Sequence, residues 1–180
     1  MRDRRLSLLG AAGCAALLLA LGACRETGAE DERFAISGKL FIFNYRVATA
    51  TYLVTLKPLA PLREGEMVVA TFEDPASGDP IVVRQKIWPK LDKVTIESPP
   101  LRCVRKDKPY AVLLQVESSE GEVVQSIKTT MTSSQDQTVL PDRPLVVGPV
   151  YTPNPELAGY PGGKLPGGAG DNCPGAEAGR

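Results

Sequence analysis

The chain contains no histidine, and this absence removes several kinds of chemistry. Histidine is the commonest general base in enzymes, the usual partner of catalytic Ser and Cys, and the commonest metal ligand. No G-x-S-x-G or S-x-x-K segment offers another route to a nucleophile. The sequence therefore favours a non-enzymatic protein with no metal and no organic cofactor. A histidine-free periplasmic hydrolase or transferase acting on cell-wall or lipid material is the alternative.

The chain also lacks an excess of charge of either sign. It has 21 Lys and Arg against 21 Asp and Glu, a formal net charge of zero. Nucleic-acid-binding proteins usually carry a basic excess that neutralises phosphates. The balance predicts that nucleic acid is not a partner.

Long apolar runs are scarce, and the main one stands at the N-terminus, in MRDRRLSLLGAAGCAALLLALGAC. A cationic start at Arg2, Arg4 and Arg5 precedes an uncharged stretch over residues 6–23. A transmembrane helix needs about 20 strongly apolar residues, and several glycines and alanines dilute this run. The pattern is typical of an export signal, so residues 1–23 are predicted to be a helical signal peptide.

The end of this run, Leu21-Gly22-Ala23-Cys24, resembles the lipobox of bacterial lipoproteins. The resemblance implies cleavage before Cys24 and fatty acylation of its thiol and its new amine. Two or more acyl chains hold a protein stably on a membrane. Arg25 replaces the aspartate that retains many lipoproteins at the inner membrane, which implies an outer-membrane anchor facing the periplasm. An ordinary secretory signal cut after Ala23 is the alternative, and the weak twin-arginine pattern Arg4-Arg5 leaves the export route open.

Composition divides the rest of the chain into three segments. Residues 24–33 hold the lipidated cysteine and a polar tether, RETGAEDER, whose nine residues would span about 15–18 Å as a random coil. Residues 34–150 are rich in β-prone residues. Residues 151–180 are rich in glycine and proline and are predicted to be a disordered tail, because they cannot bury enough apolar area to offset their ordering entropy.

Short β-prone runs separated by turn residues recur about every ten residues between 34 and 150. In one of them Tyr52, Val54 and Leu56 alternate onto one face. No helical stripe of useful length follows the signal. The sequence therefore predicts an all-β fold, a single immunoglobulin-like β-sandwich of seven to eight strands. The β-prone runs that would supply these strands are 34–45, 49–59, 66–73, 81–88, 92–98, 109–118, 121–132 and 138–150, with 101–105 as a further short candidate.

Three local clusters have a functional interpretation beside a structural one. A calcium site is one interpretation of the carboxylates Glu64, Glu66, Glu73, Asp74 and Asp79, but we favour solvated turns, because no EF-hand spacing is present. A patch for phospholipid or an acidic partner is one interpretation of the basic residues Arg102, Arg105, Lys106 and Lys108, but we favour a solvated loop. An edge that accepts a partner strand is one interpretation of the strand-like segment 128–134, but we favour a polar edge strand that faces water.

Cys103 and Cys173 remain after Cys14 is removed with the predicted signal peptide and Cys24 is assigned to the lipid. Exposed thiols in an oxidising compartment are liable to oxidation, which favours a disulfide between them. Such a bond would close a loop of 69 intervening residues and join the tail to the sandwich. The alternative is a buried Cys103 and a separate thiol at Cys173, since free cysteine is among the most buried residue types.

The strand-forming segments SGKLFIFN, YLVTL and KVTIES…KPYAVLLQVESSEGEVV resemble small β-sandwich lipoproteins related to the pilotin-like chaperones of type III secretion. The resemblance implies an outer-membrane lipoprotein that binds another protein of the cell envelope. The partner's identity does not follow from it. Together with the absence of histidine, it favours a binding, scaffolding or chaperone module.

Overall fold

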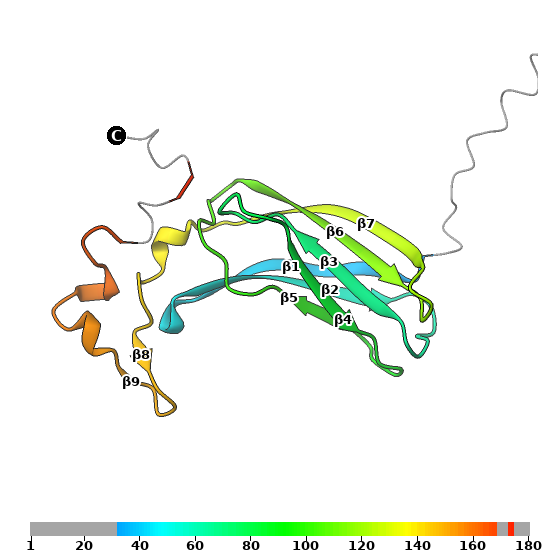
Figure 1. The fold of residues 1–180 in the computed structure, drawn as a ribbon, viewed down its shortest axis with the longest axis horizontal. Coiled ribbons are helices and arrows are strands. Elements are labelled where there is room, and N and C mark those ends of the chain that lie inside the picture. The colour runs from blue at the N-terminus through cyan, green and yellow to red at the C-terminus, as the bar shows by residue number, and fades with distance from the viewer. Residues whose placement is uncertain (1–31, 169–172, 175–180) are drawn as a thin grey trace, which may run out of the picture. The chain divides into compact units, whose positions relative to one another are not determined.

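The computed structural model describes residues 32–168, 173 and 174 as an all-β sandwich of two packed antiparallel sheets (Figure 1). This confirms the predicted fold class. The predicted signal peptide and Cys24 lie outside the described residues. No helix in the described part of the chain has the length and apolar character needed to span a membrane.

Seven strands build the sandwich. One sheet has the order β1-β2-β5 and the other the order β4-β3-β6-β7, and every neighbouring pair is antiparallel. The strands are β1 Phe34–Asn44, β2 Thr49–Pro58, β3 Met67–Phe72, β4 Ile81–Lys86, β5 Val94–Glu97, β6 Pro109–Glu117 and β7 Val123–Thr132.

This strand order is immunoglobulin-like, because the first, second and fifth strands face the third, sixth and seventh. The fourth strand pairs with the third rather than joining the first sheet. Tyr110, near the start of β6, accepts a hydrogen bond through its hydroxyl from the backbone N–H of Arg105 at 2.7 Å. A tyrosine bonded to backbone a few residues upstream at this corner is a recurring feature of immunoglobulin-like domains.

The core consists of the inward-facing residues of both sheets. Tyr52, Val54 and Leu56 are fully buried, which confirms the face that their alternation predicts. The ring of Tyr52 stacks on Phe72 of the opposite sheet, with centroids 4.9 Å apart and planes 6° from parallel. Full burial of one such apolar side chain contributes about 1.5–3 kcal/mol, so these strands supply much of the stability of the domain.

Two expected strands form differently. The segment 101–105 makes only an isolated bridge between Leu101 and Ala50, because Cys103 has a φ of +63° that breaks an extended chain. In the segment 138–150 the only strand is the short β8, Val146–Val147. The 3-10 turn η3, Gln137–Val139, precedes β8, and a second turn, η2 at Tyr45–Val47, joins β1 to β2.

The prediction of a disordered tail from residue 151 is wrong for the part that the structure describes, residues 151–168. Strand β9, Thr152–Pro153, pairs with β8, and the 3-10 turns η4, Pro155–Leu157, and η5, Pro161–Gly163, follow. Asn154, which is buried, orders the hairpin by accepting from the N–H of Glu156 at 3.0 Å and donating to the carbonyl of Pro144 at 2.8 Å. Turn capping and long-range backbone bonds replace the apolar burial that the composition lacks.

Candidate functional site

The sandwich has two chemically different ends, at the right and the left of Figure 1. The tether end contains Arg33, where β1 begins, with the loops 59–66, 87–93 and 118–122. The distal end contains η2, the loops 73–80 and 99–108, and the segment 133–168. The two ends arise from the antiparallel topology. β1 runs for eleven residues from Arg33 to η2, and β2 returns from η2 in the opposite direction, so Arg33 and η2 lie at opposite ends of the sheet.

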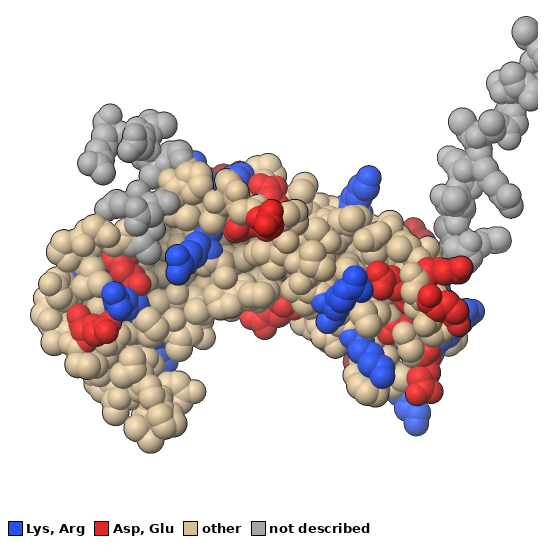
Figure 2. Space-filling model, viewed as in Figure 1, with Lys and Arg blue, Asp and Glu red and all other residues tan. Residues whose placement is uncertain are grey.

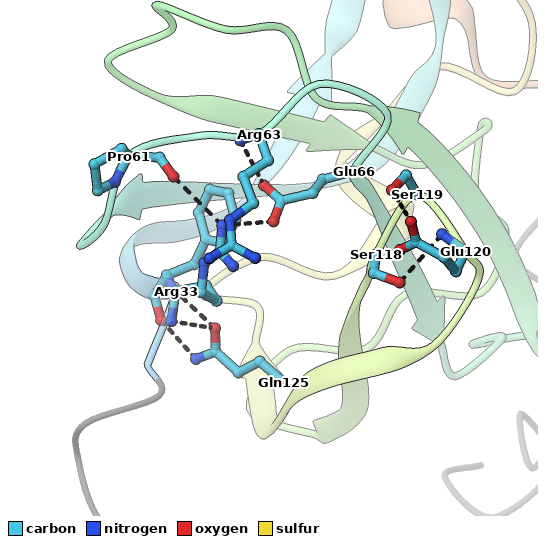
Figure 3. A network of polar contacts seen from close by, with 9 residues as sticks. Arg33, Pro61, Arg63, Glu66, Ser118, Ser119, Glu120 and Gln125 are labelled. Carbon is cyan, nitrogen blue, oxygen red and sulfur yellow. Dashed lines mark hydrogen bonds and ion pairs between the residues drawn. The ribbon is translucent and has the colours of Figure 1, made fainter.

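A buried ion pair holds the tether end together (Figure 3). The guanidinium of Arg33 lies 2.5 Å from the carboxylate of Glu66, and their side chains are 14% and 3% exposed. The second carboxylate oxygen of Glu66 accepts from the N–H of Arg63 at 3.0 Å, and Arg33 also donates to the carbonyl of Pro61. Arg33 therefore belongs to the folded domain rather than to the polar tether in which the sequence analysis placed it.

The side chain of Gln125 joins β7 to the start of β1 at the same end (Figure 3). Its Oε1 accepts from the N–H groups of Arg33 and Phe34 at 3.0 and 2.9 Å, and its Nε2 donates to the carbonyl of Phe34 at 2.8 Å. One amide thus satisfies three backbone groups at the start of β1. The two sheets are fastened to each other where the chain enters the domain.

The neighbouring turn between β6 and β7 is acidic and exposed (Figure 3). The hydroxyl of Ser119 donates to Glu120 at 2.8 Å. This contact, followed by the interaction with Ser118, holds the pKa of the Glu120 carboxyl below its ordinary value. Glu120 therefore stays negatively charged at neutral pH.

At the distal end the structure bonds Cys103 to Cys173, with Cα atoms 5.3 Å apart. The bond is the one that the sequence favoured for these two thiols, and it attaches the C-terminal region to the sandwich. Arg105 donates to the carbonyl of Pro174 beside it. Lys164 adds a second attachment by donating to the carbonyls of Thr138 and Leu140.

Five large apolar or aromatic side chains are exposed around the β8–β9 hairpin and η2. Tyr45 donates to the carbonyl of Gly162 at 3.3 Å, and the guanidinium of Arg46 lies 5.4 Å from the ring centroid of Tyr151. The hairpin tip is a largely uncharged surface in Figure 2, at the lower left. We call these residues the distal patch: Tyr45, Val147, Val150, Tyr151 and Tyr160.

Contacts with the sandwich place this patch rigidly. The N–H of Leu145 donates to the carbonyl of Arg46 at 3.0 Å, and the N–H of Asn154 donates to the carbonyl of Leu145 at 2.9 Å. These bonds tie the hairpin to the β1–β2 turn, so the tyrosines of both segments share one support. An apolar surface held by a rigid scaffold is suited to binding a protein partner.

The five carboxylates weighed as a calcium site are not brought together. Glu66 is bonded to Arg33 at the tether end. At the distal end Glu73 pairs with Lys108 at 3.3 Å and accepts from the N–H of Ala111, and Asp74 caps the turn that follows it. Within the described residues no group of three or more His, Cys, Asp or Glu side chains is arranged to hold a metal ion.

The basic cluster and the polar edge strand also have structural contacts. In the basic cluster Arg105 holds the carbonyl of Pro174, and Lys108 pairs with Glu73 and lies 4.8 Å from the ring centroid of Tyr110. In the segment 128–134 the ammonium of Lys39 contacts Thr129 Oγ1 and the carbonyl of Thr130 at 2.7 and 2.6 Å. Lys39 thus covers part of the edge that a partner strand would need.

One buried tyrosine supports the distal loops from inside. Tyr52 is fully buried, and its hydroxyl donates to the carbonyl of Glu73 at 3.0 Å. Burial, followed by the nearby Tyr110, Glu73 and Asp74, raises the pKa of Tyr52 far above its ordinary value. The phenol therefore remains a neutral donor, and its role is structural.

Sequence reasoning missed the distal patch. Its residues come from 45 and from 147–160, more than 100 positions apart, and neither segment has a motif of its own. The only local signal is the pair Val150-Tyr151 among glycines and prolines. No protein-family model and no curated protein matches this chain.

Proposed function

We propose that this chain is a lipid-anchored, non-enzymatic binding module of the bacterial cell envelope. Cys24 carries the lipid, the sandwich faces the periplasm from the outer membrane, and the distal patch binds another envelope protein. The observation that carries the proposal is the pairing of an N-terminal segment that resembles a lipobox with a largely uncharged aromatic surface at the other end of the domain.

The chemistry of the distal patch supports a protein partner. Val150 and Tyr151 are 77% and 59% exposed, high values for such large apolar side chains. Tyrosine is enriched at the energetic centres of protein interfaces, because it offers a large contact area with few rotatable bonds. The resemblance of the strand segments to pilotin-like lipoproteins supports the same class of partner.

The position of the patch fits an anchored protein. The lipid would attach nine residues before Arg33, and Arg33 lies at the end of the sandwich opposite to the patch. A partner approaching from the periplasm would therefore reach the patch without meeting the membrane. The disulfide and the Asn154 turn keep the patch presented in one geometry.

The anchor is tested by metabolic labelling with a fatty acid and by mass spectrometry of the mature N-terminus. We expect label in the wild-type chain, a triacylated Cys24 and no label in Cys24→Ser. A wild-type mature chain that starts at Cys24 without acyl groups would refute the anchor.

The binding surface is tested by placing a photo-crosslinking residue at Tyr151 in living cells. We expect one discrete adduct with an envelope protein, lost when Val150→Asp is introduced. The matched control is the same probe at Val82, an exposed valine of β4 in the sandwich, where no adduct is expected. Equal adducts at both positions, or none at Tyr151, would contradict the assignment of the patch.

A further inference from the structure

The loop between β4 and β5 exposes the only tryptophan of the chain. Trp88 begins a tight turn that the N–H of Leu91 closes onto the Trp88 carbonyl at 3.4 Å. Pro89 occupies the second position of this turn, and Lys90 the third, with a φ of +75°. Proline followed by a residue with positive φ is the pattern of a type II turn, although lysine is costly there.

The turn presents apolar and cationic groups on one surface. Trp88 is 55% exposed and Leu91 39%. The ammonium of Lys86 lies 4.4 Å from the Trp88 ring centroid, a distance typical of a cation–π contact. Tryptophan and lysine are the side chains that concentrate at the level of lipid headgroups, because each has an apolar body and a polar end.

Hydrogen bonds place this loop beside the point where the chain enters the domain. The N–H of Ile87 donates to the backbone carbonyl of Glu66 at 2.9 Å, and the carboxylate of Glu66 holds Arg33. A third exposed apolar residue, Leu59, donates from its N–H to the carbonyl of Arg33, also at 2.9 Å. Leu59 is thus bonded directly to Arg33, and the loop of Trp88 is bonded through Ile87 to Glu66, which pairs with Arg33.

The length of chain between the lipid and Arg33 limits how far this end can stand from a membrane. Residues 25–33 reach about 30 Å when fully extended, and about 15–18 Å as a random coil. A lipid on Cys24 therefore keeps the tether end within a short distance of the lipid surface. The β4–β5 loop is one of the three loops at that end, so it would lie within reach of the bilayer.

The charge of the loop suits anionic lipid. Residues 86–93 carry three lysines and one aspartate. Lys86, Lys90 and Lys93 are exposed, and none of them forms an ion pair with another described residue. Their charge is therefore available to phosphate groups, and attraction to an anionic surface acts within about one Debye length.

We propose that the β4–β5 loop, together with Leu59, docks on an anionic phospholipid surface. Trp88 and Leu91 enter the interfacial layer, and the three lysines contact phosphates. This inference rests on the proposed lipid anchor, because the loop alone is too small to hold the protein on a membrane. Its consequence is orientation: the sandwich is held by two contacts, and the distal patch faces away from the bilayer.

The test uses the mature lipidated chain, purified and reconstituted in vesicles of phosphatidylethanolamine and phosphatidylglycerol. Since Trp88 is the only tryptophan, its emission reports on this loop without labelling. We expect a blue shift on reconstitution and loss of most of the intensity when the phosphatidylglycerol is brominated. The charge variant Lys86→Glu/Lys90→Glu/Lys93→Glu is expected to float with the vesicles and to lose both signals.

A matched control moves the tryptophan to the other end of the domain, in the variant Trp88→Phe/Tyr151→Trp. Tyr151 is 59% exposed, close to the exposure of Trp88, so the two sites differ in position rather than in access to solvent. We expect no quenching by brominated lipid at position 151. Equal quenching at both positions would overturn the proposed orientation.

The remaining outcomes separate the loop from the anchor. Wild-type protein that floats with vesicles but keeps an unquenched Trp88 would overturn the docking loop and leave the anchor standing. Protein that does not float would refute the anchor and the loop with it. Emission that shifts only when solubilised envelope proteins are added would assign the loop to a protein partner and overturn the lipid assignment.

Discussion

The two ends of the sandwich are held by different means. At the tether end Arg33, Glu66 and Gln125 form a buried non-covalent clamp. At the distal end a disulfide and single turn-capping bonds hold a segment with little apolar burial. The difference shows how one domain can fix both a chain entry point and a glycine-rich exit segment.

The difference has a physical origin in the apolar area available at each end. At the tether end the ion pair lies against core strands, and its low exposure leaves the charges dependent on each other. At the distal end few residues of 151–168 are buried, so hydrophobic burial cannot offset the ordering of that segment. A covalent link reduces the entropy that must be lost there.

The largest effect is expected from removing the distal link with Cys103→Ser/Cys173→Ser. The chain-entropy model gives a loss of about 4 kcal/mol for a loop of this length. Denaturant unfolding would measure it, and limited proteolysis should show first cleavage between residues 148 and 168. Cleavage that begins within β1–β7 instead would mean that the disulfide supports the sandwich rather than the distal segment.

At the tether end Arg33→Ala should lower the free energy of unfolding by about 3 kcal/mol, because it leaves the Glu66 carboxylate buried without its partner. Arg84→Ala is the matched control, since Arg84 is 59% exposed in its pair with Glu117, and we expect at most about 1 kcal/mol from it. Similar losses in the two variants would show that the buried Arg33–Glu66 pair stabilises the domain no more than the exposed Arg84–Glu117 pair.

Also at the distal end, Tyr110→Phe removes the hydroxyl that accepts from the N–H of Arg105. We expect a loss of about 1–2 kcal/mol, because that backbone donor loses its partner. Tyr160→Phe, at an exposed tyrosine, should have almost no effect on chemical denaturation. A Tyr110→Phe variant with unchanged stability would mean that water replaces the hydroxyl as the partner of the Arg105 N–H.

The smallest effect concerns pH. The pKa of Tyr52 is raised in the folded state, so above pH about 10 the unfolded chain loses this proton while the folded chain keeps it. The unfolded state then binds fewer protons, and the free energy of unfolding falls as pH rises. Tyr52→Phe should make the free energy of unfolding fall less steeply between pH 10 and 11. An unchanged dependence on pH would contradict a raised pKa of Tyr52 in the folded state.

Much of the fold was accessible from local sequence patterns. Alternation placed Tyr52, Val54 and Leu56 on the buried face, because side chains in a strand point to opposite faces in turn. The same local reasoning failed at Cys103, where a positive φ interrupts an apparent strand, and in residues 151–168, where caps and pairings are made with distant residues.

By itself the sequence determined the strand pattern, the lipobox resemblance ending at Cys24 and the absence of histidine chemistry. The tertiary structure decided which distant groups meet: Cys103 with Cys173, Arg33 with Glu66, and Tyr45 with Gly162. Periodicity is a property of neighbouring residues, whereas these contacts depend on strand order and on which end of the sandwich each loop reaches. For that reason the sequence predicted a binding module, and only the fold located an aromatic surface at one end and a tryptophan loop at the other.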